Sequence, residues 1–385
     1  MATQIRIENS ATPVLRSILD EIEISLKTKV IDVERIGKIY HSNTNSFCIK
    51  TRSSENEPIF YFLKLLSDAN FNKELSGYEF VDGSLHTPRM VITSRSKEFK
   101  SGTSWILFEH IQGEMMAESF LRLANTPHFD SFCILEKRKE ELLKILHGKQ
   151  ISYLNFNEFV KLRPNQLFYE RLHGDRYKSF YHEPDKNISL YFNRKIVING
   201  TKLPCTVNQI FDSIRNKYAN ADNSKMIPVI MGQGDTHHGN IIVDDDIWFI
   251  DNEYADFSSP FMELAKAYYN DFIGILFFHH HDTLNNYFRM QSVVDNGTEI
   301  ILEIDCPQKI TDFIKITEIK LRERSLLVNK NAVDILSLND YLILCHTLTK
   351  NPNSYPQNIQ FLFMAFIVVL SQFDPLKPTS IYDYF

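Results

Sequence analysis

Three polar side chains in the segment Gln233–Glu253 (QGDTHHGNIIVDDDIWFIDNE) have the types and spacing needed to handle a phosphate and a hydroxyl group. Asn240 follows Asp235 by five positions, and Asp251 comes after a strand-like apolar run. A carboxylate can accept the proton of an attacking hydroxyl, while an amide and a second carboxylate can hold Mg²⁺ against phosphates. The spacing therefore predicts phosphoryl transfer, with Asp235 as the base and Asn240 and Asp251 as metal ligands.

Apolar runs on either side of these residues predict the strands that position them. Met226–Met231 (MIPVIM) is typical of a buried strand leading into the segment. Ile241–Val243 and Trp248–Ile250 predict a hairpin that turns at Asp244–Asp246. The alternative is a polar turn without chemistry, since Asp, Asn and Gly are common in turns. The number of matched positions within one window favours the catalytic interpretation.

The pattern G-D-x-H-x-G-N followed by I-D-x-E resembles the aminoglycoside phosphotransferase and choline kinase-like superfamily. The resemblance implies an α+β, bilobal protein-kinase-like fold, with a small antiparallel-sheet N-lobe and a larger, mainly helical C-lobe. It also implies a small-molecule kinase that uses Mg²⁺ and takes ATP or GTP as co-substrate. Its acceptor would be a sugar, amino sugar, amino alcohol or aminoglycoside-like antibiotic. The matching residues are Gly234, Asp235, His237, Gly239, Asn240, Ile250, Asp251 and Glu253.

Two positions depart from that family pattern. Gln233 stands where the family usually has His before Gly-Asp, and His238 stands where it often has Pro before Gly-Asn. The usual His is a scaffolding residue rather than the base. Gln233 therefore weakens the match without removing the chemistry of Asp235.

A nucleotide-binding lobe should precede this segment and supply a lysine for the phosphates. Lys64 is the one charge in the strand-like run Tyr61–Leu66 (YFLKLL), and a buried charge needs a partner or a ligand. The alternative is an exposed lysine on an edge strand. The helical segment Phe71–Val81 offers Glu74 and Glu79 as ion-pair partners; we prefer Glu74 and leave Glu79 open.

Two further segments complete the predicted nucleotide site. No G-x-G-x-x-G is present, but backbone N–H groups and short hydroxyls in a polar turn can still bind phosphate. Trp105–Met116 predicts a strand ending at a Gly turn, and by the resemblance Glu109 and Ile111 contact the nucleotide base. The predicted phosphate-covering turn, for which an ordinary hairpin turn is the alternative, consists of Ser42, Asn43, Thr44, Asn45 and Ser46.

Composition sets broad limits. The 385 residues are 43% hydrophobic and 23% charged, as in ordinary globular proteins with an ample core. A net charge of −6 gives no basic bias toward nucleic acid or anionic membranes. The five cysteines form no C-x-x-C pair, which fits a reducing, cytoplasmic setting. The longest apolar run, Phe361–Leu370, is too short to span a bilayer and predicts a buried helix.

The chain divides by pattern into three parts. Residues 1–32 predict a helical extension, with an amphipathic helix over 11–32; residues 33–112 predict the nucleotide-binding N-lobe. Residues 113–385 predict the catalytic and acceptor-binding C-lobe, with an insertion around 151–225 and mostly helical packing after residue 252. Glu263 matches the acidic residue that, by the resemblance, helps to position the catalytic loop.

Two other functions stay open at this point. A catalytically inactive, kinase-like nucleotide-binding module is one, and Gln233 together with the Gly-poor phosphate turn is its support. The other is a kinase-fold enzyme that phosphorylates protein or transfers a nucleotidyl group, which the fold alone does not exclude. Motifs do not encode the acceptor or the oligomeric state.

Overall fold

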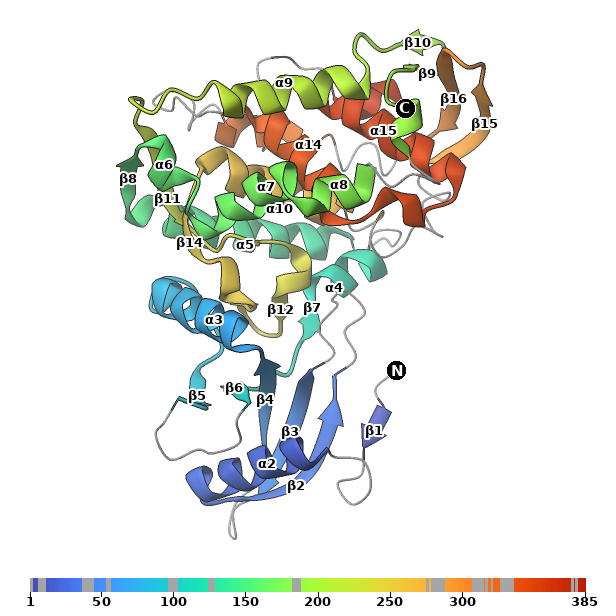
Figure 1. Cartoon of the computed structure of the whole chain (residues 1–385). Coiled ribbons are helices and arrows are strands. Elements are labelled where there is room, and N and C mark those ends of the chain that lie inside the picture. The colour runs from blue at the N-terminus through green and yellow to red at the C-terminus, as the bar shows by residue number, and fades with distance from the viewer. Residues whose placement is uncertain are drawn as a thin grey trace. The chain divides into compact units, whose positions relative to one another are not determined.

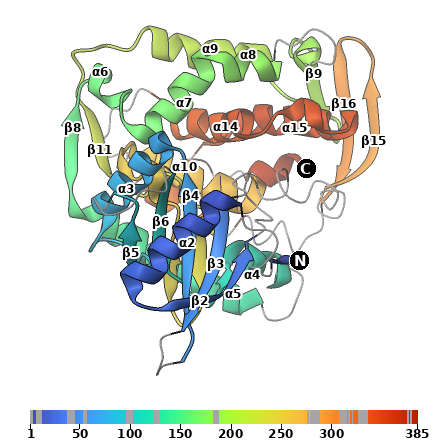
Figure 2. The same ribbon diagram turned by 60° about the horizontal axis from the view of Figure 1, so that its bottom comes forward.

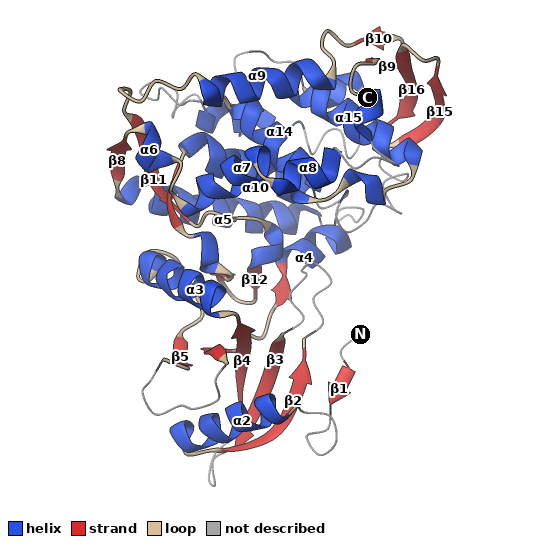
Figure 3. Ribbon diagram, viewed as in Figure 1, coloured by secondary structure: helices blue, strands red, loops and turns tan. Residues whose placement is uncertain are grey.

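The structure is a computed structural model of the whole chain. It describes residues 3–5, 12–36, 45–52, 57–95, 103–123, 129–181, 188–274, 277, 288–306, 315, 318–319, 321–325, 336–374, 377 and 380–385. The chain forms two compact units. Unit 1 comprises residues 1–119 and 239–254, and unit 2 comprises residues 120–238 and 255–385. The predicted α+β class is confirmed, with an antiparallel-sheet N-terminal region and a helical C-terminal region (Figure 3).

The main sheet of unit 1 has six antiparallel strands in the order β1-β2-β3-β4-β6-β5. Helix α2 packs on this sheet through Ile18, Ile22 and neighbouring apolar residues, which form one core with the strands (Figure 1). Because side chains alternate along each strand, every second residue of the sheet points into that core. The elements are β1 (Thr3–Ile5), α2 (Pro13–Leu26), β2 (Lys29–Arg35), β3 (Ser46–Arg52), β4 (Ile59–Leu66), β5 (Met90–Thr93) and β6 (Ser104–Glu109).

The N-terminal helix is shorter than predicted. We expected a helix over residues 11–32, but α2 ends at Leu26 and β2 begins at Lys29. Lys27 has a left-handed backbone (φ 50°) and its N–H bonds the carbonyl of Glu23, which terminates the helix. The following residues alternate and are rich in β-branched side chains, so they add a strand to the sheet instead.

Unit 1 also contains the two elements that carry the predicted site. Helix α3 (Asp68–Val81) follows β4, as predicted. The predicted hairpin is confirmed as β12 (Ile241–Val243) and β13 (Ile247–Phe249), and β12 also pairs with β7 (Glu114–Met115). The N–H of Phe249 donates to the carbonyl of His86 at 2.8 Å, which ties the hairpin to the chain after α3.

Unit 2 is built around long helices and the predicted lead-in strand. The strand β11 (Ile227–Gly232) lies between β8 (Ile151–Leu154) and β14 (Asp256–Ser258). In α15 every residue from Phe361 to Leu370 is buried, which confirms the predicted core helix. Helices α14 and α15 lie next to each other in both views (Figures 1 and 2). Helix α4 (Met116–Leu123) runs from unit 1 into unit 2, and the helices of unit 2 include α5 (Phe129–Lys149), α10 (Pro260–Tyr269), α14 (Leu338–Thr349) and α15 (Gln357–Ser371).

A second sheet in unit 2 was not expected. Residues after 252 were predicted to be mostly helical, but β15 (Arg289–Asp295) and β16 (Glu299–Asp305) form a hairpin around Gly297, whose φ of 89° favours glycine. β16 pairs in parallel with β9 (Lys195–Ile198), which also pairs with β10 (Thr201–Lys202). The described helices of the 151–225 region are α6 (Phe156–Phe159), α7 (Arg163–His173), α8 (Asp175–Tyr181), the 3-10 helix η1 (Ile188–Tyr191) and α9 (Val207–Ala219).

Across the part of the chain that the structure describes, no helix has both the length and the apolar character needed to cross a membrane.

Candidate active site

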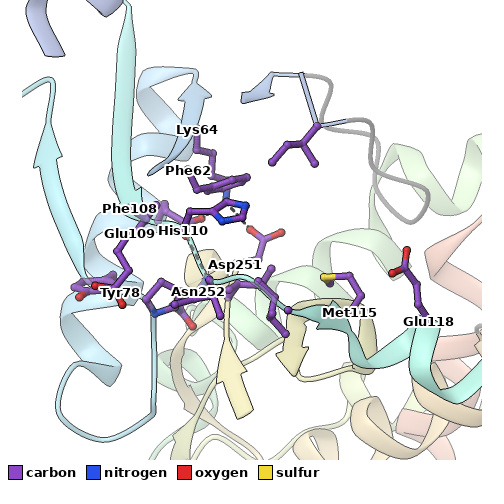
Figure 4. A pocket seen from close by; sticks show the side chains of 17 residues that line it. Phe62, Lys64, Tyr78, Phe108, Glu109, His110, Met115, Glu118, Asp251 and Asn252 are labelled. Carbon is purple, nitrogen blue, oxygen red and sulfur yellow. Dashed lines mark hydrogen bonds and ion pairs between the residues drawn. The ribbon is translucent and has the colours of Figure 1, made fainter. Parts of the chain in front are cut away.

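A cavity of about 280 Å³ opens in unit 1 between the main sheet and the β12–β13 hairpin. Its walls are mainly apolar and include the aromatic rings of Phe62, Tyr78 and Phe108 (Figure 4). The charged residues that line it include Lys64 and Asp251, both labelled in Figure 4, and Glu74. An apolar cavity with a few convergent charges is the usual form of a small-molecule site.

Lys64 joins two carboxylates: Glu74, which the sequence offered as its partner, and Asp251, which the sequence predicted only as a metal ligand. Its Nζ lies 2.5 Å from Oε2 of Glu74 and 2.7 Å from Oδ1 of Asp251. Glu74 is 2% exposed on the buried face of α3, whereas Glu79 is exposed. The open choice of partner is therefore decided in favour of Glu74. The backbone N–H of Asn252 also donates to Glu74 at 3.3 Å, which fixes the far side of that carboxylate.

Burial and charge work against each other in this ion pair. Burial disfavours the ammonium of Lys64, but Asp251 and Glu74 outweigh it and raise the pKa of Lys64 above its usual value. Burial raises the pKa of Glu74, and the nearby ammonium opposes that shift. Lys64 thus remains a buried cation that faces a cavity, an arrangement suited to binding an anion such as phosphate.

Asn240 and Asp251 flank the open end of the hairpin. Ile241 pairs with Phe249, and the N–H of Ile250 donates to the carbonyl of Asn240 at 2.9 Å. Asp251 follows directly with a left-handed backbone (φ 61°), a conformation that costs energy for a residue with a side chain. Strain of this kind is concentrated at functional sites.

The acidic groups beside this hairpin fit a hard divalent cation. Donor oxygens of Glu74, Asp251 and Glu253 lie within 4.8 Å of one another. Carboxylate and amide oxygens are the ligands that Mg²⁺ prefers. These residues therefore fit the metal that the resemblance implies, and Asn240 adds an amide oxygen from the same hairpin end.

The two residues predicted to contact the base, Glu109 and Ile111, both line the cavity. The N–H of Glu109 already donates to the carbonyl of Arg89 at 2.9 Å, and the N–H of His110 donates to the carbonyl of Phe60 at 3.3 Å. The backbone N–H of Glu109 is thus already hydrogen-bonded within the protein. Contact of this segment with a base stays a prediction.

Only part of the predicted phosphate turn can be placed. Residues 42–44 (Ser42, Asn43 and Thr44) lie outside the described residues. Asn45 and Ser46 lie at the start of β3, where Ser46 is buried and pairs in register with Lys64. The end of the turn is therefore beside the lysine, and its contact with phosphate stays a prediction.

Asp235 belongs to unit 2 and lies in the loop after β11. Gly234 has φ 79°, a backbone conformation that glycine adopts without strain. The buried side chain of Gln233 accepts from the N–H of Asp235 at 2.9 Å and from the hydroxyl of Thr236 at 3.3 Å. Gln233 thus holds the loop through its side-chain oxygen, a scaffolding contact at the position where the family pattern has His.

Helix α10 supplies two residues to this loop, and the sequence reasoning found only one of them. Glu263 is buried, and burial raises its pKa, while contacts with Lys266 and the backbone of Gly234 oppose the shift. Lys266 was missed. Its Nζ lies 2.7 Å from Oδ1 of Asp235 and also donates to the carbonyl of Gly234. The signal was a single lysine in the apolar stretch FMELAKAYY, the same signal that identified Lys64.

Comparisons with known proteins agree with this arrangement at the level of the fold. No family model matches the sequence, and no curated protein matches it. A crystal structure of aminoglycoside phosphotransferase APH(4)-Ia is similar over 93% of this chain and 99% of its own, with a TM-score of 0.51 and 12% identity. The chain has the aminoglycoside phosphotransferase fold. A thermostable mutant of that enzyme, in ternary complex with AMP-PNP and hygromycin B, matches with the same coverage and TM-score at 10% identity.

The resemblance drawn from the motif is thereby confirmed as a likeness of fold. At 10–12% identity the likeness does not carry residue roles or an acceptor across. The roles of individual residues depend on the contacts described above.

Proposed function

We propose that the chain is a phosphotransferase that moves the γ-phosphate of a Mg²⁺-bound nucleoside triphosphate to a hydroxyl group of a small molecule. The observation that carries the proposal is the meeting of Lys64, Glu74 and Asp251 at one cavity of unit 1. Asp251 lies 187 positions after Lys64 in the sequence, and the sequence predicts Lys64 as the phosphate-binding lysine, Glu74 as its ion-pair partner and Asp251 as a metal ligand.

Each part of the site has a role in this reaction. The ammonium of Lys64 binds phosphate oxygens, and Glu74 holds the lysine in place. Phe62 and Phe108 offer aromatic faces to the nucleotide base. Asn240 and Asp251 would hold Mg²⁺, which neutralises charge on the phosphates when bound. Asp235 orients the acceptor hydroxyl and takes its proton.

A small-molecule acceptor fits the fold comparison better than a protein does. The structures with the same fold include a complex with hygromycin B and a nucleotide analogue. We therefore extend to this chain an acceptor class of sugars, amino sugars, amino alcohols and aminoglycoside-like compounds, without choosing among them. Whether ATP or GTP is the co-substrate is part of the test.

The deciding experiment measures Mg²⁺-dependent release of ADP and of GDP against pools of small alcohols, with Asp235→Asn as the control. Release that one pool stimulates and the variant loses would support the proposal and name the acceptor class. Failure of Mg-ATP and Mg-GTP to bind in a calorimetric titration would refute it, because the Lys64 site would then have no ligand.

A further inference from the structure

A group of four buried polar residues lies behind the loop that carries Asp235, and the proposed reaction does not use it. Glu136 and Lys139 come from α5, His238 from the end of the loop, and Asp271 from the segment after α10. All four belong to unit 2. Their exposed fractions are 5%, 1%, 1% and 0%, so all four side chains are buried.

The ammonium of Lys139 is the centre of this group. Its Nζ lies 2.6 Å from Oε1 of Glu136, 2.6 Å from Oδ2 of Asp271 and 3.2 Å from Nε2 of His238. The donor atoms of Glu136, His238 and Asp271 are also close enough together to hold a metal ion. The ammonium already contacts all three, so the cation of this cluster is a lysine.

His238 is held by both its backbone and its ring. Its N–H donates to Oδ1 of Asp271 at 2.6 Å, and its Nε2 lies 2.6 Å from Oε2 of Glu136. The rings of Phe132 and Phe272 meet the imidazole edge-on at 5.3 and 5.6 Å. A proline at this position, as in the family pattern, has no N–H and could not make the first of these bonds.

Stability alone is a poor reason for such a cluster. Removing several charges from water costs more than burying a well-packed apolar group of the same volume, so buried ion clusters seldom add net stability. What they do provide is a fixed geometry, because each partner must stay within hydrogen-bond distance of the others. Here the fixed element is the C-terminal end of the loop Gln233–His238, whose other end is held by Gln233.

We infer that Glu136, Lys139, His238 and Asp271 are positioning residues that anchor the loop of Asp235 to the core of unit 2. The expected effect on turnover rests on the proposed function, in which Asp235 acts as the base. Loss of the anchor should let the loop move by a fraction of an ångström or more, and misplacement on that scale lowers turnover strongly.

The test compares two identical substitutions at buried aspartates. Asp271→Asn removes the charge in the cluster but keeps the side-chain size. Asp340→Asn is the control, because Asp340 is 5% exposed and its Oδ2 lies 2.6 Å from Nζ of Lys217 in the same unit, outside the cluster of four. Hydrogen exchange of loop amides 235–238 is measured on the full chain without substrate, so this arm remains informative if no acceptor is ever found.

Asp271→Asn should speed exchange of these amides by about 10-fold or more, while Asp340→Asn leaves them unchanged. In the phosphotransfer assay, Asp271→Asn should lower kcat by about 10- to 100-fold with little change in the KM for nucleotide. Lys139→Met should reproduce both effects and His238→Gln should retain part of the protection, so a failure of Asp271→Asn to fold would not remove the test.

Wild-type loop exchange in folded Lys139→Met or Asp271→Asn would overturn the inference. Equal acceleration of the loop in Asp340→Asn would also overturn it, since general destabilisation would then explain the effect. An inactive wild type with a loop that Asp271→Asn loosens would refute the proposed function and leave the anchor standing.

Discussion

The ammonium nitrogen of Lys266 lies 2.7 Å from a carboxylate oxygen of Asp235. The lysine side chain is 4% exposed, whereas the aspartate side chain is 27% exposed, so the pair joins the core of unit 2 to an accessible carboxylate. A buried cation at this distance fixes the direction of the carboxylate of Asp235. A base that must accept a proton from a hydroxyl has to be held within hydrogen-bond reach of it in the right direction.

Replacement of Lys266 by Met should therefore lower kcat by about 10- to 100-fold while the affinity for Mg-nucleotide stays within a factor of about 2. Steady-state kinetics and a nucleotide titration measure the two quantities. Lys217→Met is the control, because Lys217 also pairs with an aspartate at 2.6 Å in unit 2. Unchanged kcat in folded Lys266→Met would show that the pair is only structural.

Asp235→Asn should lower kcat by about 10²- to 10⁴-fold, because the amide cannot accept the proton of the acceptor hydroxyl. Asparagine has nearly the same size as aspartate, and other residues are proposed to bind the Mg-nucleotide, so the affinity for nucleotide should not change. Single-turnover rates and equilibrium titration separate these effects. A variant that turns over like the wild type would remove Asp235 from the mechanism.

Glu74→Gln should weaken nucleotide binding by about 10-fold, because Lys64 loses the carboxylate that holds it at 2.5 Å. It should also destabilise the fold by about 1–3 kcal/mol, since a buried hydrogen-bonded charge loses its partner. Glu79→Gln, on the exposed face of the same helix, is the matched control. Equal nucleotide affinities for the two variants would contradict the ion-pair role.

Asp251→Ala should abolish the Mg²⁺ dependence of nucleotide binding, because a predicted metal ligand is removed. Titration with and without EDTA measures that dependence in the wild type and in the variant. Asp245→Asn, at the exposed turn of the same hairpin, should behave as wild type. Retention of Mg²⁺-dependent binding by Asp251→Ala would argue against the metal site.

Stability should depend on pH through Glu318, a buried residue of unit 2. Burial raises its pKa to about 7, and the N–H of Ile381 and the hydroxyl of Tyr268 donate to its carboxyl. The folded protein therefore holds the Glu318 proton more tightly than the unfolded chain does. Its contribution to the free energy of unfolding is complete below pH 4.5, the pKa in the unfolded chain, and is lost as pH rises to about 7. The shift from 4.5 to about 7 corresponds to about 3 kcal/mol.

The side chain of the Glu318→Gln variant cannot ionise. Between pH 4.5 and 7 the wild type should therefore lose unfolding free energy relative to the variant, and above pH 7 the difference between the two should stay constant. Urea denaturation at four pH values measures that difference. A difference that does not vary with pH would show that Glu318 titrates normally.

Local spacing carried most of what could be predicted. The strand before Asp235 and the hairpin between Asn240 and Asp251 follow from short apolar runs bounded by polar turn residues, and the helix with Glu74 follows from the helical tendency of its segment. The chemistry of Lys64 followed from the cost of burying a charge. The sequence also contains a signal for the hairpin around Gly297, since Asn-Gly between two strand-like segments is a strong turn signal. The prediction of a mostly helical region after residue 252 did not take it into account.

The amino-acid sequence by itself thus determined the chemical groups, their local elements and the resemblance in fold. Only the tertiary structure decided which groups meet. It selected Glu74 over Glu79, brought Lys266 to Asp235, and assembled Lys139, His238 and Asp271 into one cluster. The physical reason is that partners across the fold depend on which face each helix buries and against what, and residue spacing along one helix or strand carries no record of that packing.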